Sequence, residues 1–133
     1  MSDSSQEDKT PYIFSWRELV SQNPDASRDF YVKLFGWTTE TMDMGPAGTY
    51  TFFNSGERPV AGMIKAPDGF GDGSTMWMDY VTVPDVDEAV EKAKGLGAKV
   101  CKEKTTVPMG SFAIVCDPQG ALIGLWEFGG SCD

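Results

Sequence analysis

Hydrophobic and polar positions follow a pattern that occurs twice along the chain. An extended apolar run at residues 12–20 precedes a segment with helical periodicity, and the same order returns from residue 76. Four blocks of the first half fall on similar blocks of the second half at a single offset of 62 residues. Self-similarity at a fixed spacing is typical of a repeated supersecondary unit. The pattern therefore predicts two copies of one structural module.

Each half is predicted to start with a strand, at residues 12–20 and 76–83, and to continue into a short helix. Asn23 and Asp85 are favourable N-caps, and Gly36 and Gly97 are predicted to end the two helices. The apolar residues of each helix recur at the spacing of one buried face. They are Ala26, Phe30 and Leu34 in the first helix and Ala89, Ala93 and Leu96 in the second.

Three further strands are predicted in each half, separated by turns rich in glycine and proline. They cover residues 38–42, 49–54 and 59–65, then 99–104, 110–116 and 121–128. The predicted fold class is α+β, with two tandem βαβββ modules whose half-barrel sheets surround a cavity and carry their helices on the outer face. A single module of this size is marginally stable alone, so we expect both to form one domain.

The predicted boundaries follow from this repeat. They are a polar, disordered tail at 1–10, a first module at 11–66, a linker at 67–75 and a second module at 76–129. The linker is rich in glycine and aspartate, and it has an alternative interpretation as a lid with Phe70 at its tip.

Composition narrows the function mainly by exclusion. The chain of 133 residues has no histidine, which excludes Ser-His-Asp and Cys-His catalysis and any histidine-ligated metal site. Twenty acidic residues against 11 basic ones give a net charge of −9. That balance argues against binding to nucleic acid or to an anionic membrane, because both need clustered lysine and arginine.

The cysteines Cys101, Cys116 and Cys132 are few and irregularly spaced. They indicate neither a disulfide framework nor a zinc site, and they favour a reducing cytoplasm. Cys101 and Cys116 fall on neighbouring predicted strands, where we expect buried, inert thiols.

Several segments resemble the vicinal oxygen chelate superfamily, the group of glyoxalases, bleomycin-resistance proteins and extradiol dioxygenases. The resemblance covers about residues 12–128. It rests on Trp16-Arg17-Glu18-Leu19, on the run from Phe30 to Trp37 that ends in Phe35-Gly36-Trp37, and on Asp117-Pro118-Gln119-Gly120 before the last strand. The first of these segments is most similar to small glyoxalase-like proteins related to mycobacterial secreted-antigen and hydroxylase homologues.

The resemblance implies four places for ligands of a divalent metal, in the first and last strands of each module. In this chain those places hold Trp16, Gly62, Met78 and Gly124. None offers the imidazole or carboxylate that Zn, Ni, Fe or Mn needs. We therefore expect the family fold and cavity with no metal and no other cofactor.

The cavity implied by the resemblance would be lined by alternate residues of each strand. The predicted ligand-binding residues are aromatic, apart from one methionine and one carboxylate. They are Trp16, Glu18, Phe52, Met78, Tyr80, Phe112 and Trp126. We expect the glycines to leave this hollow open, which suits an aromatic or amphipathic small molecule.

Glu18 has two interpretations. In the functional interpretation its carboxylate orients a ligand or acts as a general base. In the structural interpretation it is a buried acid paired with Arg17, Arg28 or a tyrosine hydroxyl. The sequence thus favours metal-independent binding of a small molecule. The alternative is a glyoxalase-like lyase or isomerase, or a dioxygenase-type enzyme, using Glu18 or an atypical metal site such as Glu18 with Glu127. The resemblance also implies a homodimer.

Overall fold

The computed structural model describes residues 9–129 and contains two compact units. Within the described range, one unit consists of residues 16–78, and the other combines residues 9–15 with residues 79–129. Most of the expected tail, residues 1–10, therefore lies outside the described residues. None of the described helices is long and apolar enough to cross a membrane.

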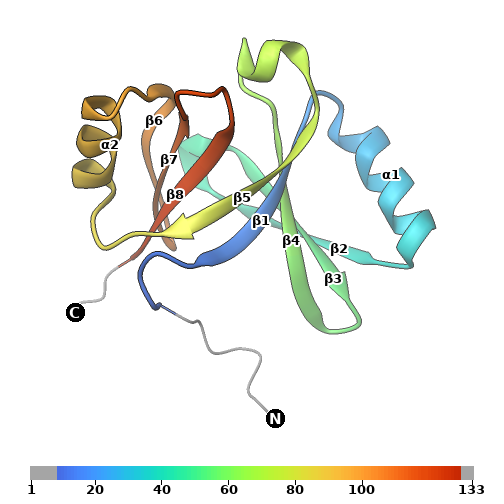
Figure 1. The fold of residues 1–133 in the computed structure, drawn as a ribbon. Coiled ribbons are helices and arrows are strands. Elements are labelled where there is room, and N and C mark those ends of the chain that lie inside the picture. Colours follow the sequence, from blue (N-terminus) through green and yellow to red (C-terminus); the bar gives the residue numbers. More distant parts are fainter. Residues whose placement is uncertain (1–8, 130–133) are drawn as a thin grey trace. The chain divides into compact units, whose positions relative to one another are not determined.

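The first unit contains one βαβββ module (Figure 1). Its elements are β1 (Phe14–Ser21), α1 (Pro24–Phe35), β2 (Thr38–Asp43), β3 (Thr49–Ser55) and β4 (Arg58–Lys65). The strands lie in the order β2-β3-β4-β1, with β1 parallel to β4 and the other pairs antiparallel. The start of β1, Phe14 and Ser15, is grouped with the second unit.

The second unit repeats this arrangement. Its elements are β5 (Met76–Thr82), α2 (Val86–Gly95), β6 (Lys99–Val107), β7 (Gly110–Cys116) and β8 (Leu122–Phe128). The order is β5-β8-β7-β6, with β5 parallel to β8. Residues 76–78 of β5 are grouped with the first unit. The α+β class and the repeated βαβββ order are confirmed.

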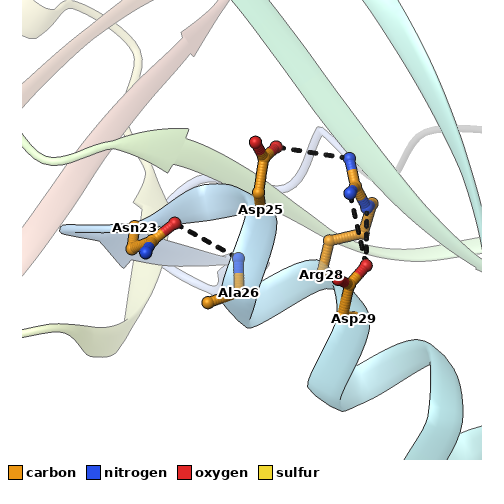
Figure 2. A network of polar contacts seen from close by, with 5 residues as sticks. All are labelled: Asn23, Asp25, Ala26, Arg28 and Asp29. Carbon is orange, nitrogen blue, oxygen red and sulfur yellow. Dashed lines mark hydrogen bonds and ion pairs between the residues drawn. The ribbon is translucent and has the colours of Figure 1, made fainter.

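Both helices begin at the predicted caps. The side chain of Asn23 accepts a hydrogen bond from the backbone amide of Ala26 at 3.2 Å (Figure 2). Asp85 accepts one from the amide of Glu88 at 3.0 Å. Each cap satisfies a backbone donor that has no partner within its helix. Gly36 ends α1 with φ of 73°. The last helical residue of α2 is Gly95, and Gly97, with φ of 99°, closes its final turn through a hydrogen bond from its amide to the carbonyl of Lys94.

The predicted buried faces are partly wrong. Phe30 and Leu34 are 57% and 56% exposed, and Ala26 is also exposed. In α1 the residue that faces the core is Tyr31, whose ring lies 6.2 Å from that of Phe53. The rings of Trp37 and Trp77 also contact Tyr31, so rotating the helix to bury Phe30 would expose this larger aromatic cluster.

The second helix shows a smaller discrepancy. Val86 and Val90 are its buried residues, whereas Ala89 packs beside them and Leu96 is 70% exposed. The β-branched side chains supply more apolar area to the core than the alanines of the predicted stripe, which explains the rotation.

Each module has its own small core between helix and sheet. In the first module this core contains Leu19, Phe53, Ala61 and Met63. In the second it contains Val83, Val86, Val90 and Ala113. Successive residues of a strand point to opposite faces of the sheet. The strand residues between these core residues therefore lie on the face of each sheet that is turned away from the helix.

The linker contains a short 3-10 turn, Phe70–Gly73. Phe70 is only 4% exposed. The side chain proposed as the tip of a lid is therefore buried in this conformation.

Candidate functional site

The sheet face opposite α1 carries three of the predicted ligand-binding residues. Trp16 and Glu18 alternate with the core residue Leu19 on β1, and Phe52 alternates with Phe53 on β3. The backbone register places Glu18 beside Gly62, and Gly62 beside Phe52. The rings of Trp16 and Phe52 meet edge to face at 6.2 Å, so the fold brings these residues together.

Tyr50 lies at the centre of this face and is absent from the predicted set. Its hydroxyl oxygen accepts a hydrogen bond from Trp16 Nε1 at 2.7 Å and is also hydrogen-bonded to Glu18. Its ring lies 5.0 Å from that of Phe52. The position was detectable in the sequence, because Tyr50 is two residues before Phe52 and strand residues with that spacing share a face.

Glu18 and Tyr50 form a polar pair in apolar surroundings. Glu18 is 4% exposed and Tyr50 is 8% exposed. Burial raises the pKa of Tyr50 well above its usual value, and the negative charge of Glu18 raises it further. The bond to a tyrosine hydroxyl confirms one of the structural pairings expected for Glu18. Arg28, another expected partner, instead reaches Asp25 and Asp29 (Figure 2).

Gly62 does not leave an open hollow. A Cβ atom at this position would lie 2.6 Å from Cε2 of Tyr50, and nearer still to its Cζ and hydroxyl oxygen. Carbon atoms in favourable contact are about 3.5–4.0 Å apart. The tyrosine therefore occupies the volume that any side chain at position 62 would enter.

The second module has the same arrangement of tyrosine over glycine. Tyr80 is the parallel neighbour of Gly124, and a Cβ at that glycine would lie 2.7 Å from Cγ of the tyrosine and nearer to two other ring atoms. Phe112 stands edge to face with Tyr80 at 6.1 Å. Trp126 pairs with Phe112 across β7 and β8. The expectation of open space at both glycines is wrong, since ring atoms fill it.

The remaining predicted residue, Met78, is 3% exposed on β5. Of the four places that the resemblance assigns to metal ligands, two thus hold apolar side chains and two hold glycines covered by tyrosine. Such a donor set does not fit a divalent metal that prefers oxygen or imidazole. Among the described residues, no group of three or more cysteine, aspartate or glutamate side chains is placed to hold a metal ion.

A separate cavity of about 240 Å³ lies within the second unit. Its walls come from the N-terminal segment, the end of β5 and the end of β8. They are Lys9, Pro11, Thr82, Val83, Pro84, Glu127 and Phe128. Glu127 accepts a hydrogen bond from the amide of Val86 at 2.9 Å, so its carboxylate is engaged at the start of α2. None of the seven predicted ligand-binding residues lines this cavity.

The repeated βαβββ modules agree with the family that comparison of the sequence shows. The chain matches the Glyoxalase/Bleomycin resistance protein/Dioxygenase superfamily over residues 13–125, and it belongs to that superfamily.

Two curated relatives illustrate the sequence similarity. One is CFP32 of Mycobacterium tuberculosis, which carries the name of a glyoxylase. It is 31% identical over 111 residues, which are 83% of this chain and 42% of that protein. The anthracycline biosynthesis protein DnrV of Streptomyces peucetius is 30% identical over 128 residues, and the match covers 86% of this chain and 46% of that protein. The chain thus spans less than half the length of these relatives.

Solved structures agree on the fold. The protein BH1468 of Bacillus halodurans has a TM-score of 0.61 at 13% identity, with 93% of this chain and 99% of that chain covered. Methylmalonyl-CoA epimerase of Mycobacterium tuberculosis has a TM-score of 0.59 at 12% identity, with 96% of this chain and 95% of that chain covered. At such low identity these likenesses support the fold alone.

Proposed function

We propose that this protein binds a small aromatic or amphipathic molecule without a metal ion, using the sheet face that carries Trp16, Glu18, Tyr50 and Phe52. The observation that carries the proposal is the position of Tyr50 over Gly62. A tyrosine ring fills the volume next to a glycine that the resemblance assigns to a metal ligand, and its hydroxyl is bonded to Trp16. The partly exposed rings of Trp16 and Phe52 then form the aromatic surface of this face.

The side chains on this face combine the features of a small-molecule site. Trp16 and Phe52 are half-buried, so part of each ring remains accessible, while Glu18 and Tyr50 supply buried polar atoms between them. Binding sites typically present apolar walls with few polar groups that fix orientation. The half-buried Phe112 and Trp126 give the second module a comparable surface.

The chemistry of the ligand follows from the same residues. Flat rings stack favourably on tryptophan and phenylalanine, and a carboxylate favours a ligand with a hydrogen-bond donor or positive charge. The two relatives from Streptomyces are named for anthracycline biosynthesis. Anthracyclines are flat, polycyclic aromatic compounds, which supports a ligand of this class.

The experiment is a titration of the full chain with an anthracycline, followed by calorimetry, in EDTA and again with added Mn²⁺, Ni²⁺ or Zn²⁺. We expect saturable binding of the same affinity in every buffer. Trp16→Phe and Glu18→Gln should each weaken binding about tenfold, the effect of losing roughly 1.4 kcal/mol. Trp37→Phe is the matched control, because Trp37 packs on the helix side of the sheet.

Binding that appears only with added metal would contradict metal independence. Equal loss of affinity in Trp37→Phe and Trp16→Phe would show that the proposed face is wrong. Conversion of the ligand by the native chain but not by Glu18→Gln would instead favour the lyase or isomerase alternative. The homodimer and the cytoplasmic location stay predictions, and light scattering tests the first.

A further inference from the structure

Two cysteine thiols meet where β6 and β7 pair. Lys99 lies opposite Cys116, and Val100 lies opposite Val115. The register then shifts between Val100 and Lys102, which leaves Cys101 as the extra residue of a β-bulge. The thiol of Cys116 is close enough to that of Cys101 to raise its pKa. The irregular strand therefore brings the two thiols near one another.

The pair is accessible, contrary to the expectation of buried thiols. Cys101 is exposed, Cys116 is half-buried, and both are free. Partial burial raises the pKa of Cys101, and the neighbouring Cys116 raises it further, whereas the positive charge of Lys99 opposes the shift. The Cys101 thiol is therefore expected to react slowly at neutral pH and faster in mildly alkaline solution, because the thiolate is the nucleophile.

We propose that Cys101 and Cys116 form a redox modification site, which small disulfides of the glutathione class convert reversibly into an intramolecular disulfide. The Cys101 thiolate attacks one sulfur of the small disulfide, whose S–S bond breaks and releases one thiol. Cys116 loses its proton and attacks Cys101 Sγ of the mixed disulfide, releasing a second thiol. The protein dithiol is oxidised, and the small disulfide is reduced to two thiols.

The bulge is what makes this pair suitable. Bulges bend a strand locally and interrupt the ladder, so the backbone there has more freedom to reach disulfide geometry than a regular pair has. Cys116 also shares a sheet face with Ile114 and Phe112, since residues two apart on a strand point to the same side. Oxidation would thus tie β6 to β7 at one end of the face that carries Phe112.

The test uses the full chain with Cys132→Ser, because trypsin leaves Cys116 and Cys132 on one peptide, residues 105–133. The protein is incubated with oxidised glutathione at pH 7 and pH 9, quenched with an alkylating agent, and analysed by mass spectrometry. We expect loss of two hydrogens, a tryptic link between residues 100–102 and 105–133, faster formation at pH 9, and full reversal by dithiothreitol.

Two matched variants separate the steps. In the same background, Cys116→Ser should stop at a stable glutathione adduct on Cys101, since the second thiol is missing. Cys101→Ser should give no intramolecular link. Closing a loop of about 15 residues should also raise Tm by roughly 5–10 °C in the oxidised protein.

Alkylation of both cysteines after exposure to oxidised glutathione would overturn the proposal. Accumulation of a double glutathione adduct in the Cys132→Ser chain would do so as well, because a neighbouring thiol should resolve the first adduct.

Discussion

Replacing Gly62 by alanine adds one methyl group at the place where the structure has least room for it. The new Cβ would fall 2.6 Å from Cε2 of Tyr50 and nearer to the hydroxyl oxygen. The clash involves a ring that is 8% exposed and held by Trp16 and Glu18, so it cannot be relieved by moving a flexible side chain into solvent.

The magnitude follows from two ways of accommodating the methyl group. If Tyr50 stays, overpacking costs about 1–3 kcal/mol. If Tyr50 moves, it loses a neutral hydrogen bond worth about 1 kcal/mol and a bond to a carboxylate worth about 1.5–3 kcal/mol. The first route costs about 1–3 kcal/mol and the second about 2.5–4 kcal/mol. Because the chain takes the less costly route, we expect Gly62→Ala to lower the free energy of unfolding by about 1–3 kcal/mol, a large share of the 5–15 kcal/mol typical of a domain.

The assay is urea denaturation followed by tryptophan fluorescence, applied to a double-mutant cycle. In a Tyr50→Ala background the clash is gone, and Gly62→Ala should then be neutral or stabilising by up to about 1 kcal/mol, because alanine loses less backbone entropy than glycine. The expected coupling between the two positions is therefore at least about 1 kcal/mol.

Gly95→Ala is the matched control. A Cβ at Gly95 meets nothing within 4 Å, so the same chemical change on α2 should be neutral or slightly stabilising. A Gly62→Ala chain as stable as the native one would refute the reasoning, and so would a loss that persists undiminished in the Tyr50→Ala background.

Two further predictions concern a tyrosine and a helix cap. The raised pKa of Tyr50 means that the folded chain keeps this proton above pH 10 while the unfolded chain loses it, so the stability it contributes is full below about pH 10 and falls as pH rises further. Urea titrations at pH 8 and pH 11 should show a steeper loss in the native chain than in Tyr50→Phe, and parallel losses would contradict the assignment. Asp85→Ala removes the acceptor for the Glu88 amide and should lower the free energy of unfolding, measured in urea, by about 1 kcal/mol. Asp68→Ala, in the exposed linker, is the control and should change it little. Equal effects of the two substitutions would argue against capping by Asp85.

The repeat and the capping residues made the order of elements predictable. Asn23 and Asp85 act locally, through hydrogen bonds to amides three residues ahead, so their role does not depend on distant parts of the chain. The alternation of apolar residues similarly placed Trp16 and Glu18 on one face of β1. The helix faces were less predictable, because Phe30 and Tyr31 are neighbours and only the sheet decides which ring is buried.

The sequence by itself determined the fold class, the two modules and the lack of hard metal ligands at Trp16, Gly62, Met78 and Gly124. These properties follow from local patterns and from residue identity. The tertiary structure alone decided what fills the space over the glycines. Tyr50 and Tyr80 reach Gly62 and Gly124 across neighbouring strands, and a contact between residues distant in sequence depends on strand register and side-chain rotamer, which no local pattern encodes.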